Sequence, residues 1–106
     1  MLDIQEIQTL YNEEKVMLTQ HFLDRIGKRG ILFAHVKSAV GNGTIIEQYH
    51  DDYPHPSALI LGYVEHNNPI HLVIGVGNGV AWLITAYYPD PEKWEKDYMT
   101  RKEKIR

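Results

Sequence analysis

Residues 70–88 read IHLVIGVGNGVAWLITAYY and predict a β-hairpin. Two runs rich in β-branched and aromatic residues flank residues 77–79, and Asn-Gly is a strong signal for a tight hairpin turn. A two-residue turn would put the hydroxyl of Thr85 opposite Leu72, inside the apolar row of the hairpin. A three-residue turn with a bulge instead pairs Leu72 with Ile84. We favour the three-residue turn because it keeps the apolar row intact.

The favoured register also gathers three polar side chains on the other face of the hairpin. His71 then lies opposite Thr85, and Tyr87 follows on the same side of its strand. An imidazole and two hydroxyls on one face make a candidate site. The simpler interpretation is a half-exposed histidine with ordinary β-propensity at the two other positions.

Working outward from the hairpin, the first half of the chain has helical spacing and the second half has short apolar runs. The segment Val16–Leu18 is too short to classify, and Pro89-Asp90-Pro91 ends the last strand and can begin a charged C-terminal helix. The sequence therefore predicts one domain over residues 1–106 with an α+β fold: N-terminal helices packed on a four-stranded antiparallel sheet, and a C-terminal helix. We expect helices over 3–13, 19–28 and 34–41, and strands over 44–49, 58–65, 70–76 and 80–88.

The composition excludes several classes of protein. Cysteine is absent, which excludes a disulfide scaffold, a thiol nucleophile and a zinc site of the cysteine type. No apolar run approaches eighteen residues and no signal-peptide pattern is present, so we expect a cytoplasmic protein without a membrane partner. The six histidines show no metal-binding spacing. We therefore expect neither a metal nor a cofactor.

The predicted helix that begins at Thr19 combines an apolar face with a basic stripe. His21 and Arg25 are one turn apart, and Arg29 follows one turn later. Guanidiniums bind phosphate oxygens bidentately, and imidazole can move protons near neutral pH. The stripe is thus a candidate phosphate-binding surface, although a solvated face of an amphipathic helix would look the same. The basic stripe comprises His21, Arg25, Lys28 and Arg29, and the apolar face comprises Phe22, Leu23 and Ile26.

An ordered series of short segments carries a family resemblance that covers about residues 15–100. On these segments the sequence resembles a small bacterial domain-of-unknown-function family whose members are often encoded beside MqsA-type (YgiT-type) zinc-finger antitoxins. The resemblance implies a fold related to RelE, BrnT and other small ribonuclease toxins. It also implies a type II toxin whose partner is a cognate antitoxin of the zinc-finger, helix-turn-helix kind. The segments are 19–25, 28–31, 45–49, 69–73, 83–87 and 89–94.

Two main functions follow from these observations and stay open, beside a third and weaker option, a small-ligand binder that uses the sheet face. The first is a metal-independent endoribonuclease in which the substrate's own 2′-hydroxyl attacks the phosphorus, with His21 and His71 as the acid–base pair and Tyr87 as a substitute acid. Its RNA-binding residues would be Arg25, Arg29 and Thr85. The second is a non-catalytic module that binds a protein partner through the basic helix face, with Trp94 and Tyr98 as anchors.

Overall fold

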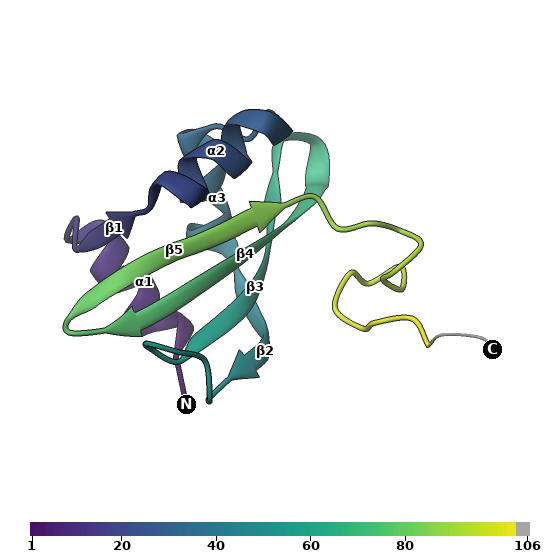
Figure 1. Ribbon diagram of the computed structural model, residues 1–106. Coiled ribbons are helices and arrows are strands. Elements are labelled where there is room, and N and C mark those ends of the chain that lie inside the picture. The colour runs from purple at the N-terminus through teal and green to yellow at the C-terminus, as the bar shows by residue number, and fades with distance from the viewer. Residues whose placement is uncertain (104–106) are drawn as a thin grey trace.

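The computed structural model describes residues 1–103 (Figure 1). This part of the chain is α+β, as the sequence predicts, but its sheet has five strands and its last residues form no helix. The elements in chain order are α1 (Ile4–Asn12), β1 (Val16–Leu18), α2 (Gln20–Arg29), α3 (Phe33–Asn42), β2 (Thr44–Tyr49), β3 (Ser57–Val64), the 3₁₀ turn η1 (Glu65–Asn67), β4 (Asn68–Gly77) and β5 (Val80–Tyr87).

The sheet has the strand order β1-β5-β4-β3-β2 and is mixed rather than antiparallel. Strands β2 to β5 form the expected antiparallel meander, while β1 pairs with β5 in parallel. The prediction of four antiparallel strands is therefore wrong. The extra strand is the three-residue Val16–Leu18 segment, which pairs with residues 81–83. Three residues are too few to show a period in the sequence, so only the partner strand identifies the segment as β-structure.

Local capping residues explain where α1 begins and where α2 begins and ends. Asp3 accepts a hydrogen bond from the backbone of Gln5 at the start of α1, and the Thr19 hydroxyl accepts one from Phe22 at the start of α2. Gly30 ends α2 in the left-handed conformation, with φ at 67°, which glycine adopts without steric cost. These local signals explain why the helix predictions are confirmed to within a residue or two.

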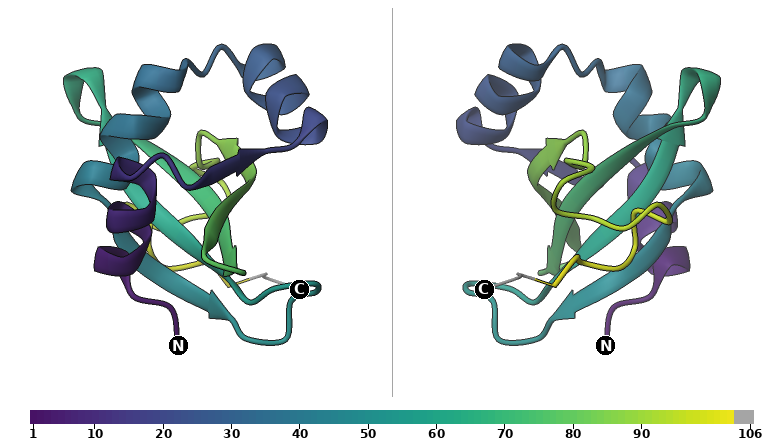
Figure 2. Two further views of the ribbon diagram at one scale, coloured as in Figure 1. Left: turned by 90° about the vertical axis from the view of Figure 1, so that its left-hand side faces the viewer. Right: turned by 90° about the vertical axis from the view of Figure 1, so that its right-hand side faces the viewer.

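All three helices cover one face of the sheet (Figures 1 and 2). Of the predicted row Ile70, Leu72, Ile74 and Val76, the first three are fully buried there, in one cluster with Phe22 and Ile26 from α2. Val76 is partly buried against this cluster. The opposite face of the sheet, called the outer face below, therefore carries the alternate residues of each strand.

The β4–β5 hairpin has neither of the two registers considered for it. Its turn is the two-residue Asn78-Gly79, because Gly77 pairs with Val80. One bulge then shifts the ladder: Ile74 pairs with Leu83, but Val73 pairs with Thr85. The bulge places the extra residue Ile84 in β5. The tight Asn-Gly turn forms, and the core side of the hairpin stays apolar because Leu72 pairs with Ala86. The expected pairing of Leu72 with Ile84 is wrong, since Ile84 lies beside Gly75 on the outer face.

Residues 88–103, called the tail below, cross the outer face without forming the predicted C-terminal helix (Figure 2). Asp90 does begin a turn, since its carbonyl accepts from the backbone N–H of Trp94. The chain then reverses, and the N–H of Glu95 donates to the carbonyl of Thr100. The reason is burial: Trp94 is only 4% exposed because its indole packs on the sheet. Burying one large aromatic side chain outweighs the weak propensity of a short charged segment.

Among residues 1–103, no helix is long and apolar enough to cross a membrane.

Candidate functional site

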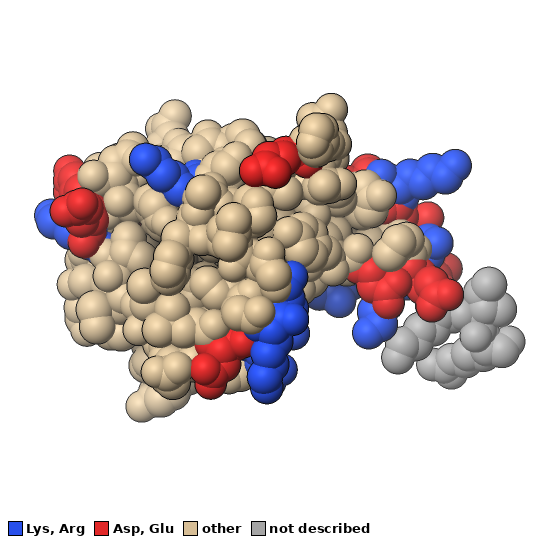
Figure 3. Space-filling view, turned by 90° about the horizontal axis from the view of Figure 1, so that it is seen from above, with Lys and Arg blue, Asp and Glu red and all other residues tan. Residues whose placement is uncertain are grey.

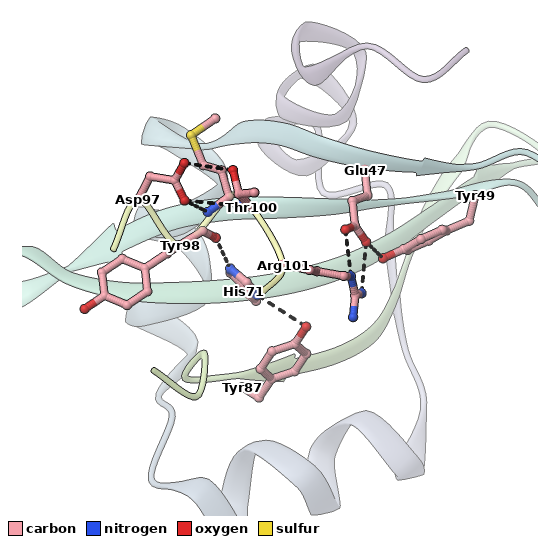
Figure 4. A network of polar contacts seen from close by, with 9 residues as sticks. Glu47, Tyr49, His71, Tyr87, Asp97, Tyr98, Thr100 and Arg101 are labelled. Carbon is pink, nitrogen blue, oxygen red and sulfur yellow. Dashed lines mark hydrogen bonds and ion pairs between the residues drawn. The ribbon is translucent and has the colours of Figure 1, made fainter. Parts of the chain in front are cut away.

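His71 lies at the centre of the outer face and is fully buried. Its ring meets Tyr87 on the neighbouring strand and Trp94 of the tail edge-on, with ring centroids 5.3 Å and 4.5 Å apart. The His71–Tyr87 pairing follows from the two-residue turn together with the bulge, whereas the expected three-residue turn would have paired His71 with Thr85. The tail covers the imidazole from above (Figure 4).

Both ring nitrogens of His71 are occupied. Nε2 is 2.8 Å from the carbonyl oxygen of Tyr98, and Nδ1 is 3.3 Å from the hydroxyl of Tyr87. A carbonyl can only accept, so Nε2 carries the proton and Nδ1 accepts from the Tyr87 hydroxyl. Burial lowers the pKa of His71 from its ordinary value of 6.5, against the opposing influence of the Tyr98 carbonyl and the Glu47 charge. The imidazole is therefore neutral at pH 7.

A charged pair stands beside this histidine (Figure 4). The guanidinium of Arg101 donates two hydrogen bonds to the carboxylate of Glu47, at 2.8 Å and 3.0 Å, and the hydroxyl of Tyr49 donates to the same carboxylate. The Arg101 hydrogen bonds lower the pKa of Glu47, while burial and the Glu47 charge raise the pKa of Tyr49 to about 12. At neutral pH the carboxylate is charged and the phenol is protonated.

The charged pair and the histidine form one connected network. The guanidinium of Arg101 also lies over the indole of Trp94, 4.6 Å from the ring centroid, and Trp94 packs on His71. Burial raises the pKa of Tyr87, so its hydroxyl is protonated at neutral pH. One patch of the outer face thus combines a neutral imidazole, a carboxylate, a guanidinium and two phenols.

Arg29 reaches the edge of the same face from the end of α2. Its guanidinium donates to the carbonyl of Ala86 at 2.7 Å and to the hydroxyl of Thr85 at 3.3 Å. Burial raises the pKa of Tyr87, and the positive charge of Arg29 lowers it by a smaller amount. The structure therefore brings together four of the six predicted site residues: His71, Tyr87, Thr85 and Arg29.

The two other predicted site residues, His21 and Arg25, lie elsewhere. Both are exposed on α2, which packs on the face of the sheet opposite His71. His71 is enclosed by Tyr87, Trp94 and the tail backbone, so the structure does not form the expected cleft between the two histidines. The basic residues of α2 do face solvent as expected. Figure 3 shows Lys and Arg at separate places, several beside Asp or Glu, rather than as one continuous basic surface in the part of the chain that it colours.

Sequence reasoning did not assign Glu47, Tyr49 or Arg101 to the site, and it named Trp94 only as an anchor for a protein partner. Glu47 and Arg101 are 54 positions apart, so no spacing rule connects them. A bulge after Ile45 also shifts the register of β2. The one available signal was Trp94 itself, a large aromatic residue in an otherwise charged segment, which indicates a buried contact.

The DUF4258 family profile, described as a domain of unknown function, matches residues 18–88. The chain belongs to the DUF4258 family. Four residues of the network lie inside the DUF4258 segment, whereas Trp94 and Arg101 follow it. The four are Glu47, Tyr49, His71 and Tyr87. Searches of curated proteins and of solved structures found no match.

Residues 1–103 hold no group of three or more histidine, aspartate or glutamate side chains that could bind a metal ion.

Proposed function

We propose that this protein is a metal-independent endoribonuclease whose active site is the outer face around His71. The observation that carries the proposal is the network in which His71, Tyr87, Glu47 and Arg101 meet on one sheet face. Cleavage by the substrate's own 2′-hydroxyl needs a base for one proton, an acid for the leaving 5′-oxygen and positive charge at the phosphate. The outer face offers a group for each task, and none of them is a protein nucleophile.

The roles follow from the protonation states. His71 is neutral at pH 7 and is the base for the 2′-proton. Tyr87 is protonated and is the proton donor to the leaving oxygen. Arg29, which belongs to α2 and not to the tail, supplies charge stabilisation for the phosphate from the edge of the sheet. Each acid or base contribution is worth roughly 10²–10⁴-fold in rate.

The tail closes this site. The carbonyl of Tyr98 occupies Nε2 of His71, and Trp94 covers the ring. RNA reaches the imidazole only when the tail lifts, which also frees Arg101 from Glu47. Once the Tyr98 carbonyl leaves, the neutral ring can exchange tautomers, so that Nε2 accepts a proton and Nδ1–H donates to Tyr87.

The biological role that we propose is the toxin of a type II toxin–antitoxin pair, acting on RNA in the cytoplasm. This part of the proposal rests on the resemblance to domains encoded beside zinc-finger antitoxins and to RelE-like and BrnT-like ribonucleases. The proposed protein partner is a cognate antitoxin.

The test is incubation of the full-length protein with a defined RNA in EDTA, followed by analysis of the new ends. We expect cleavage in EDTA that leaves 2′,3′-cyclic phosphate and 5′-hydroxyl ends. His71→Gln should lower the rate at least about a hundredfold while the protein stays folded by circular dichroism. His21→Ala is the matched control and should retain the rate, since His21 is exposed on the helical side. Loss of cleavage in His21→Ala but not in His71→Gln would contradict the proposed site.

A second candidate function is supported by the exposed basic residues of α2. His21, Arg25 and Lys28 all face solvent, and an acidic partner could bind them without any catalysis. Under this alternative Trp94 is not a free anchor, because it is buried against the protein's own sheet. The RNA assay separates the two: a module that only binds leaves the RNA intact.

A further inference from the structure

A second feature of the outer face is a cavity of about 360 Å³ near the β4–β5 turn. Its walls come from the loop that joins β2 to β3 and from the middle of β5. The volume lies at the low end of the range of small-molecule sites, about 300–1,000 Å³. It therefore suits one ring system rather than a larger ligand. Among its lining residues are Asp52, Tyr53, His55, Gly75, Trp82 and Ile84.

Aromatic rings dominate this cavity, and two of them are already stacked. The imidazole of His55 lies on the indole of Trp82, with ring centroids 5.6 Å apart and an angle of 27° between the planes. The indole N–H donates to the carbonyl of Gly77 at 3.2 Å, which holds Trp82 in place. Tyr53 stands at the rim and is 95% exposed. A planar ligand would meet aromatic surface on a preformed platform.

Glycine at position 77 of β4 makes room for this platform. A Cβ at Gly77 would lie 2.0 Å from the His55 ring, so the imidazole occupies the space that any other residue would fill. A Cβ at Gly75 would lie 3.5 Å from the side chain of Ile84, on the floor of the cavity. The stacked platform therefore depends on Gly77, and the floor of the cavity is formed by Gly75 and by Ile84 at the bulge of β5.

The cavity lies on the same face as His71. Gly75 and His71 are both outer-face residues of β4, four positions apart, which corresponds to about 13 Å along the strand. Trp82 and Tyr87 are their partners on β5. A ligand that binds the cavity and extends along the hairpin would thus reach the His71 site. Single-stranded RNA has this form, with planar bases on a flexible backbone.

We propose that this cavity is a nucleobase subsite, and that it selects guanine. This inference rests on the proposed ribonuclease function, because it identifies the base read beside the cleavage site. Asp52 lines the cavity, and a carboxylate only accepts hydrogen bonds. One of its oxygens accepts from the hydroxyl of Ser57, which orients the group and leaves other lone pairs available. Guanine presents two adjacent N–H donors on its Watson–Crick edge, which match a carboxylate, while Trp82 and His55 supply the stacking surface.

The test is titration of the full-length protein with the four nucleoside 5′-monophosphates, followed by tryptophan fluorescence and calorimetry. We expect GMP to bind most tightly and to quench Trp82. Trp94→Phe, which leaves Trp82 as the sole indole of the chain, should show the same quenching. Trp82→Ala should weaken GMP binding roughly tenfold or more, as loss of base stacking does. Asp52→Asn should remove the preference for GMP over AMP. Trp82→Phe keeps an aromatic platform and serves as the milder variant if Trp82→Ala fails to fold.

The outcomes separate this proposal from the ribonuclease proposal. In His71→Gln, GMP binding should be unchanged while cleavage is lost. GMP binding without any RNA cleavage would support the base subsite and contradict the ribonuclease proposal. Cleavage that ignores guanine and is unaffected by Trp82→Ala would overturn the base subsite and leave the nuclease. Binding of N-acetyltyrosinamide in place of all four nucleotides would overturn it too, since the cavity would then recognise an aromatic peptide side chain.

Discussion

At the scale of single residues, His71 explains how the outer face is organised. A fully buried imidazole is tolerated because both of its nitrogens have partners, Tyr87 and the carbonyl of Tyr98. The same two partners decide its tautomer, and burial keeps it neutral. A neutral imidazole beside a protonated phenol is useful as a base, and it is also a source of pH-dependent stability.

We predict that acid destabilises the protein through His71. The pKa of His71 in the folded protein lies below the ordinary value of 6.5. Just below pH 6.5, therefore, the imidazole is protonated in the unfolded chain but still neutral in the folded protein. The stability present above pH 6.5 is therefore lost as the pH falls through the folded pKa, with a slope of up to about 1.4 kcal/mol per pH unit. The charges that face the ring are Glu47 and Arg101. Both groups keep their charge down to about pH 5, because their mutual hydrogen bonds lower the pKa of Glu47 and raise the pKa of Arg101.

Urea unfolding at pH 7 and pH 5 measures this effect. The wild-type protein should lose more stability between the two values than His71→Gln, in which nothing titrates at this position. Equal losses in the two proteins would assign the acid sensitivity to another group.

At the scale of elements, the β4–β5 hairpin connects the core to the site. Its bulge lets Leu83 and Ala86 both face the helices, although an unbroken strand would point them to opposite sides. The same irregularity leaves Thr85 and Tyr87 on the outer face. One extra residue in β5 therefore serves both the apolar core and the polar network.

We predict that Ile74→Ala destabilises the fold by about 2–5 kcal/mol, the range for removing a large buried aliphatic side chain. Ile74 is fully buried in the cluster beneath the helices. Val73→Ala, at the adjacent half-buried position on the outer face, is the matched control and should cost clearly less. Thermal or urea unfolding gives both values. Near-wild-type stability of Ile74→Ala would show that the core lies elsewhere.

At the scale of the whole molecule, the sheet is covered on both faces. The helices bury one side, and the tail crosses the other (Figure 2). The tail is held by the indole of Trp94, by the Glu47–Arg101 pair and by the Tyr98 carbonyl on His71. Because Arg101 is largely exposed, its ion pair contributes at most about 1 kcal/mol. The buried indole of Trp94 therefore provides most of the free energy that keeps the tail on the sheet.

We predict that loosening the tail opens the site. Trp94→Ala should increase the accessibility of His71, read from its reaction with diethyl pyrocarbonate, and should raise the rate of RNA cleavage. Removing this buried indole should also lower stability by about 3–5 kcal/mol. Arg101→Ala is the milder variant, and it should increase the reactivity of His71 with a small loss of stability. Faster modification of His71 together with slower cleavage in Trp94→Ala would indicate that the tail completes the site instead of covering it.

The sequence by itself determined the elements that depend on neighbouring residues. Thr19 and Gly30 mark the two ends of α2 within one turn of the helix, and the alternation in β4 identifies which residues enter the core. Signals of this kind act over a few positions and need no knowledge of the rest of the chain. The sequence also pointed to His71 and Tyr87 as residues of one face, but that result depends on the hairpin register, and the structure reaches it through a different turn and a bulge.

Only the tertiary structure decided which distant segments meet. Three features join residues that are far apart in the chain. They are the pairing of β1 with β5, the bulge at Ile84 and the contact of Glu47 with Arg101. The tail shows the reason most clearly: its sequence favours a helix, yet it bends over the sheet so that Trp94 is buried against His71. Local propensities amount to tenths of a kcal/mol per residue, whereas burying one large side chain is worth several times more. The burial of Trp94 on the outer face therefore determines the conformation of the tail.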